Sequence, residues 1–472
     1  MFRQVSSYMT ANVVSAVFGF ISVVLFTRVL SPNEYGIYII GSGIAAMIST
    51  VLFGWIKVSI VRLASEEGAA DIRTTVLFSF LALILLIPIL ASIAIKFFPT
   101  TFDYPMSAIA LAYSIGFFEF YLELFRSSQR TTAYMWSTII RAALALASSC
   151  LLVIVFDLGG DGLILSVALS YVLTSALYSA YIWRRPLKPF DSRILKEMLR
   201  FGLPMTVSGA VFMLHAMLDR LVIGAYLGEH AAGIYGASAD LVRQVILFPG
   251  VAVGSAIIPI AIRLLTQGNK EAATRHMLHS MELLLGVLMP AVVGMALVAR
   301  KLAGLILGGE FHEAAANLIP IIAFAWLFRS ISYQFIHVSF QLHKKPLLMI
   351  AQGVITLVSN IAAMSILIPR YQLIGAAWSL LLSEVIGTLV GYALSRKAYK
   401  LPFDLVSTAK VCLATALMAL PTYVVDRSFP GSGALDLALP VVTGAIVYVL
   451  ASFALNVADI RTGTMARLAA RA

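Results

Sequence analysis

The sequence predicts an all-α, polytopic membrane protein with about fourteen transmembrane helices. Hydrophobic residues make up 60% of the chain and charged residues only 12%, whereas soluble proteins carry about 25% charged residues. Apolar stretches of about 20 residues, each long enough to cross roughly 30 Å of hydrocarbon, recur along the whole length. The short-period alternation typical of an outer-membrane barrel is absent. A water-soluble fold is therefore excluded, and helices are the expected spans.

The apolar segments define the predicted spans, and short polar corners join them. Their approximate ranges are 8–29, 36–61, 74–98, 105–126, 131–156, 162–183, 201–226, 232–262, 276–299, 315–340, 347–368, 373–395, 406–425 and 436–457. The first segment follows a single arginine, Arg3, and lacks a clear cleavage site, so we interpret it as a span rather than a removed signal peptide. No room is left for a sizeable soluble domain.

Lysine and arginine concentrate in the loops on one side of these spans, which the positive-inside rule assigns to the cytoplasm. Both termini are predicted on that side. The loop residues on the opposite side are Arg28, Lys96, Arg300, Lys301, Arg370 and Arg427. The net charge of +11 and the pI near 9.6 are thus spread over short loops, and nucleic acid is not an expected partner.

Short motifs occur twice in the same order, which indicates a duplicated six-helix unit. "LSPNEYGIY" (30–38) is matched by "LGEHAAGIY" (227–235), and "GLILSVALS" (162–170) by "GAAWSLLLS" (375–383). Six is an even number of spans, so the copies should point the same way, related by a pseudo-two-fold axis along the membrane normal. Such paired lobes enclose a central cavity and can rock against each other, which favours a transporter working by alternating access.

The repeat predicts the domain organisation. We expect an N-lobe of spans one to six (residues 1–183), followed by a cytoplasmic amphipathic linker (184–200). A C-lobe of spans seven to twelve (201–395) comes next, and the last segment (396–472) holds two further spans and a cytoplasmic tail. Within the linker, apolar and basic residues alternate with helical spacing over 193–201, typical of a helix on the inner membrane surface.

Three stretches resemble the polysaccharide transporter branch of the multidrug/oligosaccharidyl-lipid/polysaccharide flippase superfamily: "TRVLSPNEYGIYII", "MLDRLVIGAYLGEHAAGIYGASADLV" and "VGSAIIPIAIRLL". The resemblance implies a bacterial inner-membrane protein that flips undecaprenyl-diphosphate-linked oligosaccharides from the cytoplasmic to the periplasmic leaflet. It also implies membrane lipids, a polysaccharide polymerase and a chain-length regulator as partners. Such a protein is not an enzyme and needs no cofactor; a monomer is the default expectation.

Charged residues inside the spans are the candidate site, because a charge deep in a span costs about 2.5–3.5 kcal/mol on insertion scales and usually faces a partner or a wet cavity. Guanidinium groups bind phosphate bidentately and stay charged. The predicted cationic cavity residues, Arg141 and Arg329 first among them, are Arg141, Arg329, Arg243, Arg220 and Lys57. The carboxylates that could couple transport to an ion are Glu384, Asp240 and Asp219.

Structural interpretations of the same charges stay open. Asp240 and Arg243 lie at i and i+3 and can pair on one helix face. An Arg329–Glu384 pair between spans ten and twelve would account for two further charges, and Lys57 can capture a head group or extend to the interface. Pro249, Gly250 and Pro259 make span eight the predicted hinge, although prolines also produce static kinks.

Other functions remain as alternatives. An ion-coupled drug exporter or a peptidoglycan-precursor flippase of the same superfamily is possible, and a membrane polysaccharide polymerase or ligase is the alternative from a different class. The outer loops are short, and no nucleotide-binding or hydrolase motif is present. The two cysteines, Cys150 and Cys412, lie in apolar segments, and the scattered histidines predict no metal site.

Overall fold

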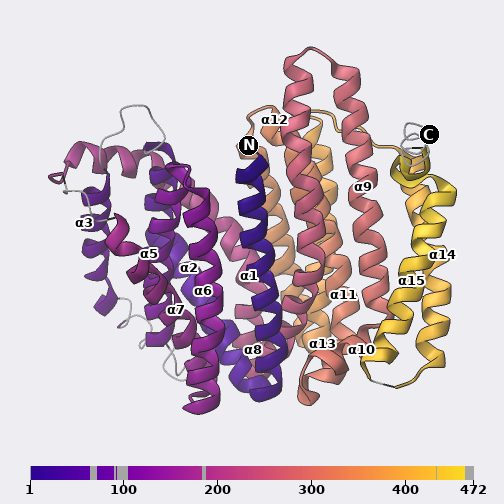
Figure 1. Cartoon of the computed structure of the whole chain (residues 1–472), viewed down its shortest axis with the longest axis horizontal. Coiled ribbons are helices and arrows are strands. Elements are labelled where there is room, and N and C mark those ends of the chain that lie inside the picture. The colour runs from indigo at the N-terminus through magenta and orange to yellow at the C-terminus, as the bar shows by residue number, and fades with distance from the viewer. Residues whose placement is uncertain are drawn as a thin grey trace. The chain divides into compact units, whose positions relative to one another are not determined.

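The computed structural model describes residues 2–63, 72–89, 92, 105–182, 188–431 and 433–462. Over these residues the protein consists of helices joined by short connections (Figure 1). The predicted third span beyond residue 89, the linker residues 184–187 and the tail from residue 463 lie outside the described residues.

The helices of the first half are α1 (Phe2–Val29), α2 (Pro32–Leu63), α3 (Arg73–Ile84), α5 (Pro105–Ser127), α6 (Thr131–Ser149), η1 (Cys150–Val155, a π-helical turn), α7 (Gly159–Ile182) and α8 (Ser192–Thr266). Those of the second half are α9 (Lys270–Leu297), α10 (Ala299–Ile306), η2 (Gly309–Phe311), α11 (His312–Ile331), η3 (Ser332–Ile336, π-helical), α12 (His337–Leu342), α13 (Pro346–Ser395), α14 (Leu405–Ser428), α15 (Ala434–Leu455) and η4 (Val457–Asp459).

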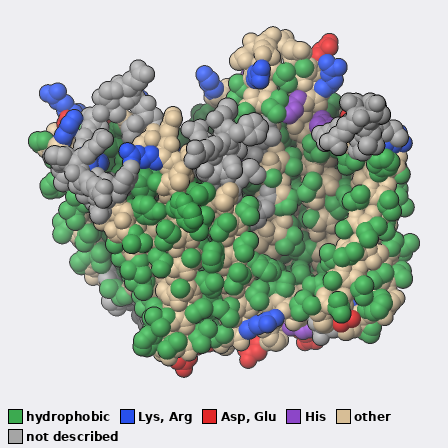
Figure 2. All heavy atoms as spheres, viewed as in Figure 1, with side chains coloured by type: hydrophobic (Ala, Val, Ile, Leu, Met, Phe, Trp, Pro, Cys, Tyr) green, Lys and Arg blue, Asp and Glu red, His purple; other side chains and the backbone are tan. Residues whose placement is uncertain are grey.

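Among the described residues, eleven helices are long and apolar enough to cross a membrane. Two of them hold two spans each, because the backbone leaves helical geometry at Gly228 inside α8 and at Gln372 inside α13. The shorter apolar helix 73–89 lies where the third span is predicted. Hydrophobic side chains cover the flanks of the helices in view, with lysine and arginine near their ends (Figure 2). The predicted all-helical polytopic fold is confirmed.

The chain forms two compact units, residues 1–236 and 237–472. In the first unit α2 packs against α5 and α7, and α1 packs against α6. In the second unit α11 packs against α9 and α13, while α14 and α15 lie side by side. The first span of α8 packs along α2 within the first unit. The predicted lobes, their boundaries and their symmetry axis stay predictions.

The first repeated corner begins a helix through its own side chains. Ser31 Oγ accepts from the Glu34 backbone N–H at 3.3 Å, and Glu34 Oε2 accepts from the Ser31 backbone N–H at 2.9 Å. This reciprocal arrangement is a capping box, and Pro32 occupies the first helical position, where its missing N–H costs nothing. The motif S-P-N-E therefore specifies where α2 begins.

The second repeated corner uses a glycine instead. Gly228 has φ +84° and ψ 176°, a conformation that L side chains rarely adopt, and it separates the two spans of α8. Glu229 follows directly and starts the next helical segment. The two corners thus reach similar connections by different local chemistry.

The two "GIY" corners meet through their glycines. A Cβ on Gly36 would lie 2.6 Å from the carbonyl carbon of Glu229 and closer still to its oxygen. A Cβ on Gly233 would lie 2.9 Å from the carbonyl carbon of Pro32, again with the oxygen nearer. Each glycine faces the carbonyl four positions before the other glycine, so the contact is reciprocal, and only residues without a side chain permit it.

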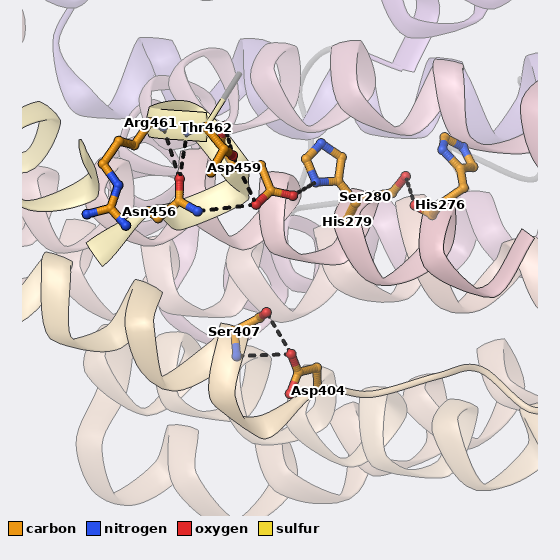
Figure 3. A network of polar contacts seen from close by, with 9 residues as sticks. All are labelled: His276, His279, Ser280, Asp404, Ser407, Asn456, Asp459, Arg461 and Thr462. Atoms are coloured by element: carbon orange, nitrogen blue, oxygen red, sulfur yellow. Dashed lines mark hydrogen bonds and ion pairs between the residues drawn. The ribbon is translucent and has the colours of Figure 1, made fainter. Parts of the chain in front are cut away.

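The C-terminal helices are fixed by polar caps at one end of the second unit (Figure 3). Asp404 caps α14 by accepting from the backbone N–H groups of Val406 and Ser407, at 2.9 and 3.3 Å. After α15, Asn456 accepts from the Arg461 backbone N–H at 3.0 Å, and Asp459 lies 4.0 Å from His279 of α9. These contacts connect the chain after α15 to α9.

Candidate functional site

The predicted site residues on α11 and α13 pair with each other. Arg329 Nε donates to Glu384 Oε1 at 2.6 Å, and only 9% and 4% of their side chains are exposed. The Arg329 guanidinium also lies over the Trp326 ring, 5.1 Å from its centre. The interhelical Arg–Glu pair that the sequence left open is therefore formed, and each charge offsets the other.

Further polar contacts are formed along α13. Thr388 Oγ1 donates to the Phe328 carbonyl at 3.1 Å and lies 3.0 Å from Ser332 Oγ. Gln352 Nε2 donates to the Gly387 carbonyl at 3.0 Å. The Thr388 contacts join α13 to α11 and η3, and the Gln352 contact joins the two spans of α13.

Lys57 of α2 pairs with a carboxylate of α5. Its Nζ donates to Glu119 Oε1 at 2.8 Å, and the two side chains are 41% and 33% exposed. One helical turn further along α5, Glu123 is buried and lies 3.5 Å from Arg126. A cavity of about 10 Å³ beside Lys57 and Glu119 has room for one water molecule. Lys57 thus has a partner inside unit 1, which neither sequence interpretation included.

Two further carboxylates have partners on their own chain segment. Asp240 lies 3.5 Å from Arg243, in the i and i+3 arrangement expected from the sequence. Asp219 accepts from the Tyr235 hydroxyl at 3.3 Å, and both residues are buried. Arg220, the neighbour of Asp219, is half-buried on α8 and makes contacts of its own.

Arg141 lies in the middle of the fifth predicted span, on α6. Its guanidinium is 4.9 Å from the centre of the Tyr171 ring on α7, and the side chain is half-buried. A cation over an aromatic face contributes about 0.5–2 kcal/mol but leaves the charge uncompensated. Within the described part of the chain, no carboxylate pairs with Arg141. Among the described residues, Arg141 is therefore a cation in a predicted span whose charge no carboxylate offsets.

The predicted hinge in α8 lies within continuous helix. Pro249, Gly250 and Pro259 all have helical backbone, and the non-helical position of α8 is Gly228. Gly254 lies closely against Gln334 of η3, since a Cβ there would be 2.9 Å from the Gln334 Cβ. The hinge stays a prediction.

Metal coordination has no candidate here among the described residues: no group of three or more His, Cys, Asp or Glu side chains could hold an ion. Cys150 and Cys412 are not joined by a disulfide. Among the described candidate residues, the charged side chains form pairs and polar contacts, and Arg141 lies against an aromatic ring.

Comparison with known proteins identifies the class. Residues 1–265 match the family of polysaccharide biosynthesis proteins, and the chain belongs to that family. This confirms the resemblance found in the sequence. The fold is that of the polytopic transporters in the multidrug/oligosaccharidyl-lipid/polysaccharide superfamily, so family and fold are those of transporters.

Particular relatives are similar at low identity. The teichuronic acid biosynthesis protein TuaB of Bacillus subtilis (strain 168) is 23% identical over 298 residues, 60% of each chain. The probable low-salt glycan biosynthesis flippase Agl15 of Haloferax volcanii is 23% identical over 394 residues, 80% of each chain. The match to TuaB thus spans less than two thirds of that protein.

Solved structures share the fold. The lipid II flippase MurJ in an inward closed conformation has a TM-score of 0.80 at 15% identity, covering 94% of this chain and 98% of that one. An inward-facing multidrug resistance MATE family transporter has a TM-score of 0.65 at 15% identity, covering 83% and 97%. At such identity the likeness establishes the fold alone.

Proposed function

We propose that the protein flips undecaprenyl-diphosphate-linked oligosaccharide repeat units from the cytoplasmic to the periplasmic leaflet, for polysaccharide biosynthesis. The family, the flippase fold and the glycan flippase among its relatives support this function. The arrangement of basic loops supports placing both termini in the cytoplasm. The bacterial inner membrane is part of the proposal because of the resemblance to the family. Alternating access, a monomer, and a polymerase or chain-length regulator as partners complete the proposal.

Arg141 is the observation that carries the substrate assignment. A mid-span guanidinium without a carboxylate partner costs free energy unless an anion or water reaches it. A lipid diphosphate carries about two negative charges and matches the fork of the guanidinium. Arg329 contributes less to the substrate site than the sequence suggests, because Glu384 already offsets its charge.

A reconstitution assay tests the function. Purified protein in liposomes should move a fluorescent diphosphate-linked oligosaccharide lipid between leaflets. Arg141→Ala should slow this movement by roughly 10- to 150-fold, as expected for the loss of charge-assisted hydrogen bonds to phosphate. Arg141→Lys should retain part of the activity, and Arg300→Ala, an exposed arginine far from the spans' centre, should match wild type.

The same assay separates the alternatives. Transport of a cationic dye in place of the lipid would indicate a drug exporter, and preference for a peptidoglycan precursor would indicate that flippase. Wild-type liposomes that move none of the lipids would contradict the proposed function. Equal rates for Arg141→Ala and wild type would remove Arg141 from the substrate site.

Ion coupling is tested with carboxylate variants in the same liposomes. Glu384→Gln, Asp240→Asn and Asp219→Asn remove one negative charge each while keeping the size of the side chain. If one of these groups carries the coupling ion, its variant should lose the dependence of transport on a proton or sodium gradient. Unchanged gradient dependence in all three would exclude these carboxylates as coupling groups.

A further inference from the structure

A basic cavity lies in unit 1 at the end of α2 and the first turns of α8. Its volume is about 620 Å³, within the range of about 300–1,000 Å³ typical of small-molecule sites. Its lining side chains are Arg62, Arg193, Lys196, Glu197, Arg200 and Phe201. The spans place it on the side that carries most of the lysines and arginines. None of these residues belongs to the candidate site described above.

The segment that forms the cavity is firmly held on α2. Met198 is fully buried, and its carbonyl accepts from Ser59 Oγ at 3.0 Å. Gly202 lies directly against the backbone of Trp55, since a Cβ there would be 2.9 Å from the Trp55 carbonyl carbon. The apolar side chains of this segment that pack against the same core are Ile194, Leu195 and Leu199. These residues form the first turns of α8, and their apolar side chains pack against protein.

The polar face of this helix is therefore turned toward the cavity in a fixed position. Arg193, Lys196 and Arg200 lie at i, i+3 and i+7, which share one side of a helix. Arg62 approaches from α2 and lies over the Phe201 ring, 4.3 Å from its centre. Four cations thus converge from two helices on one space.

Cations outnumber carboxylates among the described side chains that line this cavity. Glu197 is the single carboxylate beside four cations among the described lining residues, so these residues together carry three excess positive charges. None of the ion pairs formed among the residues that the structure describes includes a lining residue of this cavity. Surface cations commonly remain solvated, but here a fixed backbone holds four of them around a volume large enough for a ligand.

We propose that this cavity binds the diphosphate group of the lipid-linked substrate at the cytoplasmic surface, before translocation begins. The inference rests on the proposed function for the identity of the lipid. Three guanidinium groups can each donate two hydrogen bonds to phosphate oxygens, and the excess charge balances a diphosphate better than the single charge of a phospholipid phosphate. Binding here concentrates the substrate next to the end of α2 and the first turns of α8.

Direct binding provides the test. Full-length protein in phosphatidylcholine nanodiscs is titrated with farnesyl diphosphate in a calorimeter. Arg193→Gln and Arg200→Gln should each raise the Kd by about tenfold or more, because each removes charge-assisted hydrogen bonds. Glu197→Gln should lower the Kd, since it removes the one opposing charge. Arg263→Gln, an exposed arginine at the other end of α8, controls for the change in total charge and should bind like wild type.

A second arm uses nanodiscs that contain phosphatidylglycerol. The wild-type Kd for farnesyl diphosphate should rise less than tenfold there; complete loss of binding would mean that the cavity serves bulk phospholipid, and would overturn the proposal. An unchanged Kd in Arg193→Gln and Arg200→Gln would overturn it as well. If the variants lose binding while wild type moves no lipid in liposomes, the proposed function fails and the anion site stands. If wild type moves lipid and the variants bind normally, the cavity assignment alone fails.

Discussion

Replacing Gly233 with alanine tests the reciprocal contact between the two "GIY" corners. The new Cβ would lie 2.9 Å from the Pro32 carbonyl carbon and from the Gly36 nitrogen, whereas ordinary contacts begin at 3.4 Å. The helices must therefore separate by at least about 0.5 Å, and further for the carbonyl oxygen. Overpacking lowers the free energy of unfolding by about 1–3 kcal/mol. Because the clashing atoms belong to the backbone and cannot rotate away, we expect a loss of about 2–3 kcal/mol for Gly233→Ala.

Thermal unfolding in detergent measures this cost. Unit 1 spans residues 1–236, and for a unit of that size each kcal/mol lowers Tm by about 2–4 °C, so Gly233→Ala should lower it by about 4–12 °C. Gly209→Ala is the matched control on the same helix, because no atom lies within 4 Å of its added Cβ. Gly36→Ala combined with Gly233→Ala should cost less than the sum, since one separation relieves both clashes. Equal Tm values for Gly233→Ala and Gly209→Ala would refute the reasoning.

Three other perturbations have defined outcomes. Arg329→Met should destabilise unit 2 by about 3–5 kcal/mol because it removes the cation that offsets the buried charge of Glu384. Arg329→Met with Glu384→Leu should cost much less, as urea or thermal unfolding would show; equal losses would contradict the pair. Gln372 has φ +50° and ψ −128°, a strained conformation, so Gln372→Gly should raise the unfolding free energy by about 1–2 kcal/mol and Gln372→Ala should not. Hydrogen bonds from Ser407 and the Val406 backbone lower the pKa of Asp404, so its contribution to capping α14 is present at neutral pH and lost as pH falls through that lowered pKa. The Tm difference between wild type and Asp404→Ala should therefore vanish in acid. A difference that persists at every pH would exclude the carboxylate as its cause.

Hydropathy and local spacing were sufficient for much of the fold. The spans follow from composition, and Asp240 with Arg243 could be paired because an i, i+3 relation is visible in one helix. The Lys57–Glu119 contact could not be predicted, since it depends on the rotation of α2 against α5, which no periodicity within either helix specifies. The same limit applies to the basic cavity: the spacing of Arg193, Lys196 and Arg200 is readable, but their approach to Arg62 is not.

The Arg329–Glu384 pair shows why charge alone misjudges a site. In the sequence both residues stand deep in spans without a near partner, which is the pattern of a binding group. In the structure the two side chains neutralise each other across α11 and α13. Arg141 shared that sequence pattern and meets only an aromatic ring among the described residues. Tertiary contacts therefore distinguish two arginines that look equivalent in the sequence: a carboxylate offsets the charge of Arg329, and among the described residues none offsets that of Arg141.

The reciprocal glycine contact bears on how such a chain could arise. Each corner offers the other the same two features, a bare glycine and a carbonyl four positions earlier, so the surface is complementary to its own duplicate. A patch of this kind is what two identical subunits present to each other across a two-fold axis. If the chain arose from a six-helix ancestor by duplication, one such corner would have allowed that ancestor to associate with a second copy. Neither Gly36 nor Gly233 can gain a side chain without pushing its counterpart away.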